Sequence, residues 1–151
     1  MKASRHLKYC MPIKTGGNHP PLFCIHGEPL KFAMLLKADR PVYGLCYAYH
    51  NYRRSEMPKT LADYADIYIE ELKTIQPKGP YFLCGYSAGG LIAYEMARKL
   101  LAEGEKIGDL MLVEPTIYFI GANVFRGTVK HLNKDLPSIK KLFSYLPRLP
   151  W

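Results

Sequence analysis

Short apolar runs recur along the chain, separated by longer segments in which apolar and polar residues follow a helical period. Each run is almost continuously apolar over four or five residues, which is typical of strands buried on both faces of a parallel sheet. The strands predicted from these runs are residues 21–25, 41–45, 81–84 and 110–113.

Two longer segments carry helical periodicity. In the first, apolar residues recur at helical spacing from Leu61 to Ile75, and Thr60 with Asp63 three residues later forms a near capping box. The Pro- and Gly-rich residues 76–80 end it. The second runs from Leu91 to Leu101 and is closed by Gly104.

This order predicts the α/β class, with a doubly wound and mostly parallel sheet covered on both faces. After Pro115 the pattern degrades into scattered aromatic and basic residues punctuated by prolines. We expect a single, partial domain over residues 1–151, with its core at 12–115 and a basic, lid-like segment of short mobile helices at 116–151.

Composition narrows the class of protein. With 151 residues and 48% hydrophobic content, the chain can build one real core. The first 14 residues lack a signal-peptide core, and no run is long enough to span a membrane. Four cysteines are widely spaced without a CxxC pair. We therefore expect a cytoplasmic protein with reduced cysteines, which are Cys10, Cys24, Cys46 and Cys84.

The net charge of +8 is unevenly distributed. Lys and Arg outnumber Asp and Glu by 10 to 3 in residues 1–60 and by 6 to 1 in residues 116–151, whereas residues 61–115 hold 5 against 9. Basic ends can attract an acidic partner, but we favour the simpler interpretation that these are ordinary solvated lysines. No dense basic run with interleaved aromatic residues indicates nucleic-acid binding.

The strongest chemical signal is Gly85-Tyr86-Ser87-Ala88-Gly89, which matches G-x-S-x-G and lies directly between an apolar strand and an apolar helix. A nucleophile elbow occupies this place in α/β-hydrolases: a strained turn lifts the serine hydroxyl off the end of the sheet. Gly85 and Gly89 would let the helix pack close to the strand. The alternative is a Gly-rich turn with an incidental serine.

An elbow also needs donors for the oxyanion that forms during acyl transfer. The Ala88 backbone N–H, at the start of the following helix, is the first candidate. The loop after residues 21–25 supplies the second, from Gly27 or Glu28. His26 precedes the nucleophile, whereas the catalytic histidine of such hydrolases follows it, so we interpret His26 as a hydrogen-bonded histidine at a strand end.

A family resemblance emerges from several linked segments. Residues 20–27, 40–45, 76–90 and 93–98, in that order, resemble the type I thioesterase domain of polyketide and nonribosomal peptide synthetases. The resemblance spans about residues 12–115. It implies an α/β-hydrolase fold and a Ser87 acyl-enzyme that releases an acyl or peptidyl chain from the phosphopantetheine thioester of an acidic carrier protein. No metal or tightly bound cofactor is implied.

The resemblance also assigns an acid. The family carries its triad acid after the strand that follows the elbow helix, a position that Glu114 occupies here. Glutamate can orient a catalytic histidine, but a solvated carboxylate at a strand end is an equally good interpretation. The family's histidine comes beyond a helical lid, and His131 lacks a suitable setting, so we expect the chain to stop inside the lid.

Two consequences follow from a missing C-terminal part. The enzyme would lose a triad member, which typically costs several orders of magnitude in rate. The sheet would also keep an unpaired apolar edge, which favours self-association. Besides a thioesterase, the sequence leaves open a non-catalytic remnant that binds a carrier protein or subunit, and a serine esterase or acyltransferase.

Overall fold

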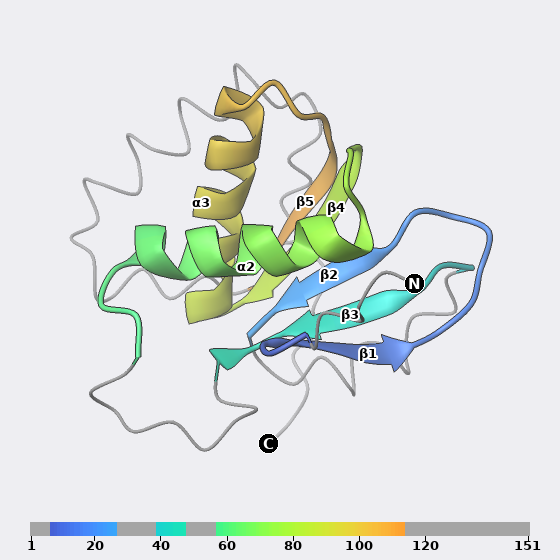
Figure 1. Ribbon diagram of the computed structural model, residues 1–151, viewed down its shortest axis with the longest axis horizontal. Helices are drawn as coiled ribbons and strands as arrows, with labels where there is room; N and C mark the ends of the chain where they lie inside the picture. Colours follow the sequence, from blue (N-terminus) through green and yellow to red (C-terminus); the bar gives the residue numbers. More distant parts are fainter. Residues whose placement is uncertain (1–6, 27–38, 48–56, 114–151) are drawn as a thin grey trace, which may run out of the picture.

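The computed structural model describes residues 7–26, 39–47 and 57–113. They form a five-stranded sheet in the order β1-β3-β2-β4-β5, with two helices (Figure 1). The elements are β1 (Cys10–Lys14), β2 (Leu22–Ile25), β3 (Val42–Leu45), α2 (Leu61–Ile75), β4 (Tyr81–Tyr86), α3 (Ala88–Ala102) and β5 (Ile107–Val113).

The strands β3, β2, β4 and β5 run parallel to one another, and β1 pairs antiparallel with β3 at the edge of the sheet. The predicted α/β class with a mostly parallel sheet and its four strands are therefore confirmed. β1 was not predicted. From β2 the chain goes to β3 on one side, and then crosses through α2 to β4 on the other side of β2. The sheet thus has a topological switch point between β2 and β4, where open α/β sheets bind their ligands at the carboxyl ends of the strands.

The helix α2 begins as the sequence predicts. The Thr60 side chain accepts a hydrogen bond from the Asp63 backbone N–H, and the Asp63 carboxylate accepts one from Thr60 N–H, which completes a capping box. The helix ends at Ile75 with Gln76 as its C-cap. By contrast, α3 begins at Ala88, three residues before the predicted start at Leu91.

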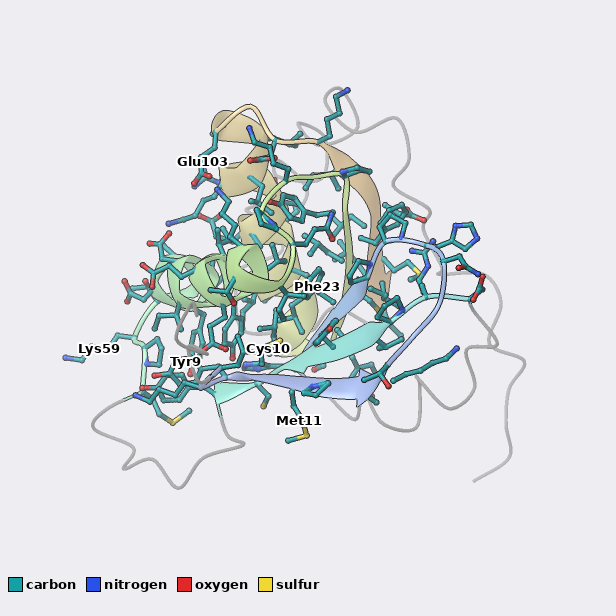
Figure 2. The ribbon with its side chains drawn as sticks, turned by 45° about the vertical axis from the view of Figure 1, so that its right-hand side comes forward. Tyr9, Cys10, Met11, Phe23, Lys59 and Glu103 are labelled. Carbon is teal, nitrogen blue, oxygen red and sulfur yellow. The ribbon has the colours of Figure 1, made fainter. Side chains whose placement is uncertain are left out.

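Both described helices pack on one face of the sheet (Figure 1). The main core lies between these helices and the sheet. Phe23 and Leu83 of the sheet are fully buried there. The helices contribute Leu72 of α2 and Met96 and Leu100 of α3 to the same core. Figure 2 shows Phe23 between the strands and the helices. A smaller cluster occupies the opposite face, formed by Leu22, Cys24, Val42 and Cys84.

An acidic side chain ties the edge strand to the helical layer. Glu71 of α2 accepts hydrogen bonds from the backbone N–H groups of Lys8, at 2.7 Å, and of Tyr9, at 2.8 and 3.0 Å. This carboxylate fixes the chain just before β1, which begins at the buried Cys10 (Figure 2). The exposed Met11 points away from the helices in the same view.

In the described part of the chain, no helix has the length and apolar character needed to cross a bilayer. All four cysteines are free thiols; Cys10, Cys24 and Cys84 are buried and Cys46 is half-buried. The lid-like segment predicted at residues 116–151 lies outside the described residues.

Candidate active site at the carboxyl edge of the sheet

The backbone turns sharply at Ser87, the residue between β4 and α3. Ser87 has φ 52° and ψ −122°, a region that residues with a Cβ rarely adopt. The predicted strained turn between strand and helix is confirmed. Ser87 is the N-cap residue of α3, but its side chain makes no capping hydrogen bond to that helix.

Two glycines permit this turn by letting backbone approach backbone. A Cβ placed on Gly85 would lie 2.2 Å from the Gly89 carbonyl oxygen. A Cβ on Gly89 would lie 1.9 Å from the Ile25 carbonyl oxygen and 2.7 Å from the His26 Cβ. Real Cβ atoms do not come this close to such groups, so these two positions accommodate only glycine without a shift of the backbone.

The N-terminus of α3 provides the electrostatic part of the site. An α-helix leaves its first backbone N–H groups without intrahelical partners and carries a partial positive charge there. Ala88 is the first residue of α3 and is exposed, and Ser87 is half-buried. The Gly90 N–H donates to the Ser87 carbonyl oxygen at 3.0 Å, closing the first turn. Developing negative charge beside Ser87 would therefore meet a favourable field.

The end of β5 lies at the same turn. Tyr86 of β4 is the register partner of Val113, and the Ser87 N–H donates to the Val113 carbonyl oxygen at 2.9 Å. Val113 is followed in the chain by Glu114, the candidate triad acid, which lies outside the described residues. The strand that leads to this carboxylate thus ends beside the serine.

The end of β2 brings His26 to the elbow. His26 also has a positive φ, 50°, and its Nε2 lies 2.5 Å from the Tyr68 hydroxyl. Burial lowers the pKa of His26 below its usual value, which favours the neutral ring. The prediction of a hydrogen-bonded histidine at a strand end is confirmed. The partner, Tyr68, was predicted only as an apolar position of the helix, because helical periodicity does not reveal where a hydroxyl points.

Two other residues of the predicted site, Gly27 and Glu28, the candidates for the second oxyanion donor, lie outside the described residues. So does His131, the histidine that follows Ser87 in the sequence and that we did not assign to the site. The part of the chain that the structure describes contains no cluster of His, Cys, Asp and Glu suited to a metal ion. The catalytic roles of Ser87 and Ala88 remain predictions.

Comparison with known proteins gives consistent matches. The family model of the thioesterase domain matches residues 20–118. The chain is 41% identical over 114 residues to a dimodular nonribosomal peptide synthase of Bacillus subtilis (strain 168), a match covering 72% of this chain and 5% of that protein. A non-reducing polyketide synthase of Cladonia grayi is 46% identical over 79 residues, covering 52% of this chain and 4% of that protein. The chain therefore spans a small fraction of these relatives.

Solved structures share the fold. The NocB thioesterase domain, in covalent complex with a fluorophosphonate nocardicin G analogue, has a TM-score of 0.65 at 26% identity, over 87% of this chain and 60% of that chain. The surfactin thioesterase domain SrfTE has a TM-score of 0.55 at 20% identity, over 73% of this chain and 45% of that one. The predicted α/β-hydrolase type is thereby confirmed. The family match includes the strand, turn and helix around Ser87, and it shows that this chain belongs to the thioesterase domain family.

Proposed function

We propose that this chain carries the nucleophile half of a thioesterase that takes an acyl or peptidyl group from a carrier-protein thioester onto Ser87. The observation that supports this most directly is the conformation of Ser87, with φ 52°, between the carboxyl end of β4 and the N-terminus of α3. Strained non-glycine backbone at a strand-to-helix turn is a feature of nucleophile elbows. A serine without a catalytic role would not require this strained conformation.

The reaction assigns each group a task. Ser87 Oγ attacks the thioester carbonyl carbon and forms a C–O bond, and the carbonyl oxygen becomes an oxyanion beside the Ala88 N–H. As the tetrahedral intermediate collapses, the C–S bond breaks and the thiolate leaves with the proton released by the serine. Water or an internal nucleophile of the acyl chain then attacks the acyl-enzyme and restores the hydroxyl.

We assign Gly27 or Glu28 as the second oxyanion donor and Glu114 as the acid that orients a histidine. Support comes from chain order, because residues 27 and 28 follow β2 and residue 114 follows β5. β2 ends at the switch point beside β4, and β5 ends at Val113, whose carbonyl oxygen accepts from the Ser87 N–H. The relatives are nonribosomal peptide and polyketide synthases, which supports a carrier protein with a phosphopantetheine arm as the partner.

A second candidate function is a module that binds a carrier protein without turnover. Reaction at Ser87 requires a base, because an unassisted serine hydroxyl is a weak nucleophile, and a chain in which no base reached Ser87 would act as such a module. The two candidates differ in whether Ser87 becomes acylated.

The test is acyl transfer from a synthetic thioester. The chain is incubated with octanoyl-pantetheine, and intact-mass spectrometry with peptide mapping locates any octanoyl group. A thioesterase acquires one octanoyl group on Ser87 or releases octanoate as the acyl-enzyme is hydrolysed, and Ser87→Ala does neither. A wild-type chain that stays unmodified, releases no octanoate and still binds the carrier protein would contradict the enzyme and favour the binding module. Equal acylation by octanoyl-pantetheine and by an octanoyl oxoester would favour a general serine esterase or acyltransferase.

A further inference from the structure

We propose that Tyr68 and His26 are positioning residues, and that their hydrogen bond holds the carboxyl end of β2 against the first turn of α3 and so sets the geometry of the elbow. The effect on reactivity rests on the proposed function of Ser87. The hydrogen bond between Tyr68 and His26, and its effect on the geometry of the elbow, do not depend on that proposed function.

His26 is held in an unfavourable conformation by contacts on several sides. Its φ of 50° is in the left-handed region. Its backbone N–H donates to the Leu45 carbonyl oxygen at 3.0 Å, which fixes it to β3. Its ring lies edge-on to the rings of Tyr64 and Tyr68, with centroids 5.6 and 5.7 Å away. The left-handed residue is thus held by both the sheet and α2.

The Tyr68 hydroxyl connects three parts of the chain. Tyr68 is fully buried in α2, and its oxygen accepts a hydrogen bond from the Tyr47 backbone N–H at 2.8 Å, just after β3. The same oxygen lies 2.5 Å from His26 Nε2, just after β2. One hydroxyl therefore links the ends of two neighbouring strands to the helix that covers them.

The link reaches the elbow through Gly89. The close approach described above leaves no room for a Cβ between Gly89 and the Ile25–His26 backbone. A shift of His26 would therefore move the first turn of α3, which contains Ala88 and Gly89 and follows Ser87. The elbow rests on the residue that Tyr68 holds.

The Tyr68 hydroxyl can make both contacts at once. Its oxygen accepts from the Tyr47 N–H, and it either donates its hydrogen to His26 Nε2 or accepts a second hydrogen bond from an Nε2–H. Among the described residues, the titratable groups whose rings face His26 are the phenols of Tyr64 and Tyr68. We therefore expect His26 to be neutral and held in a single tautomer, because either direction of this hydrogen bond fixes the state of Nε2.

The first test is long-range ¹H–¹⁵N NMR of the histidine rings in the wild-type chain, in Tyr68→Phe and in Tyr64→Phe. Tyr64→Phe is the matched control, because it keeps a ring edge against His26 and removes a hydroxyl one helical turn away. The wild type and the control should show one and the same tautomer. Tyr68→Phe should show a tautomer mixture, together with shifted amide signals at Ala88 and Gly89.

A wild-type His26 that populates both tautomers would overturn the proposal, because the ring would then not be held by a fixed hydrogen bond, and this measurement needs no variant to fold. Unchanged amide signals at Ala88 and Gly89 in a folded Tyr68→Phe would overturn it as well. Both results are independent of whether Ser87 reacts.

The second test is the rate at which a biotinylated fluorophosphonate labels Ser87, measured at a temperature at which all variants are folded. Tyr68→Phe should slow labelling by about tenfold or more, because small misplacements of a nucleophile have large effects on rate, whereas Tyr64→Phe should retain the wild-type rate. Equal rates in Tyr68→Phe and the wild type would refute the positioning role. A wild type without labelling would instead count against the proposed function, and the NMR result would still decide the structural link.

Discussion

Backbone strain is concentrated beside the candidate nucleophile. Within the described residues, the non-glycine positions with positive φ are His26 and Ser87, at the ends of neighbouring parallel strands. Such conformations cost on the order of 1–3 kcal/mol each and persist only where surrounding contacts enforce them. Here those contacts are the close packing of Gly85 and Gly89 and the hydrogen bond to Tyr68. The strain marks the site before any chemistry is considered.

Gly89→Ala tests this close packing. The new methyl group would lie 1.9 Å from the Ile25 carbonyl oxygen, so β2 and α3 must separate. We expect a loss of unfolding free energy of about 1–3 kcal/mol or more, measured by urea denaturation. Ala102→Ser, at the exposed end of α3, is the control and should change stability little. A Gly89→Ala variant as stable as the control would show that the strand and helix are not in such close contact.

Cys10 gives the fold a pH dependence. Burial, with a smaller effect from the Glu71 carboxylate, raises the pKa of Cys10 from 9.0 to about 12. As pH rises, the unfolded thiol therefore loses its proton first, and the contribution of Cys10 to stability falls between pH 9.0 and about 12. Urea unfolding across this window should show a shallower decline in Cys10→Ala than in the wild type. Cys46→Ala is the control, and equal slopes in all three proteins would contradict the assignment.

At the scale of elements, hydrogen bonds from side chains to backbone determine where the chain is anchored. Thr60 and Asp63 start α2, and Glu71 of the same helix binds the N–H groups of Lys8 and Tyr9. Between α2 and α3, Lys73 pairs with Glu103, and Lys99 pairs with Asp66 at 2.5 Å. The ion pairs are partly exposed and stabilise little. The Glu71 contact has the larger structural effect, because it holds a separate strand.

Glu71→Ala should release β1 from the helical layer. Removing the carboxylate leaves two backbone N–H groups without this acceptor, which costs about 1–3 kcal/mol. Hydrogen exchange at the amides of residues 8 and 9 should accelerate strongly, whereas β4 should remain protected. Glu70→Ala, an exposed neighbour on the same helix, should leave exchange unchanged. Similar exchange in both variants would argue against the contact.

Sequence pattern predicted the elements whose signal is local. The Thr60–Asp63 spacing and the apolar runs of β2, β3 and β4 specified their positions within a few residues. β1 was missed because two of its residues are exposed, one of them Pro12, and because its pairing with β3 depends on residues far along the chain. β5 begins earlier than predicted, at Ile107, because Gly108 packs against the Phe82 ring, a contact that local propensity does not register.

The site was predictable only in part, because some of its contacts join residues that lie far apart in the sequence. Gly85, Ser87 and Gly89 are adjacent in a recognisable motif, so their geometry followed from sequence. The hydrogen bond between His26 and Tyr68 joins residues 42 positions apart. No local spacing indicates such a contact. Glu114, Gly27 and Glu28 remain predictions, because they lie outside the described residues.

At the scale of the whole molecule, strand order determines where the site can be. The switch point between β2 and β4 brings His26 and Ser87 to one edge of the sheet, and β5 adds Val113 there. The two outer strands, β1 and β5, differ in how readily their free edges could pair with another strand. Pro12 removes a backbone donor from β1, whereas β5 is a seven-residue strand whose neighbour among the described strands is β4.

We expect self-association through β5. Its half-buried apolar residues and unpaired edge among the described strands would favour pairing with another chain, so sedimentation velocity should show mass increasing with concentration. Met111→Lys, which places a charge on β5, should reduce this association. Met11→Lys on β1 adds the same charge and should not. A wild-type chain that stays monomeric at every concentration would contradict the prediction.

The most direct test of the central claim, that the fold presents Ser87 as a nucleophile, is covalent labelling with a fluorophosphonate followed by peptide mapping. We predict a single adduct on Ser87, formed slowly but to completion in the folded chain, and lost in Ser87→Ala and in urea. The absence of an adduct on the folded chain, or labelling that continues at the same rate in urea, would contradict the account.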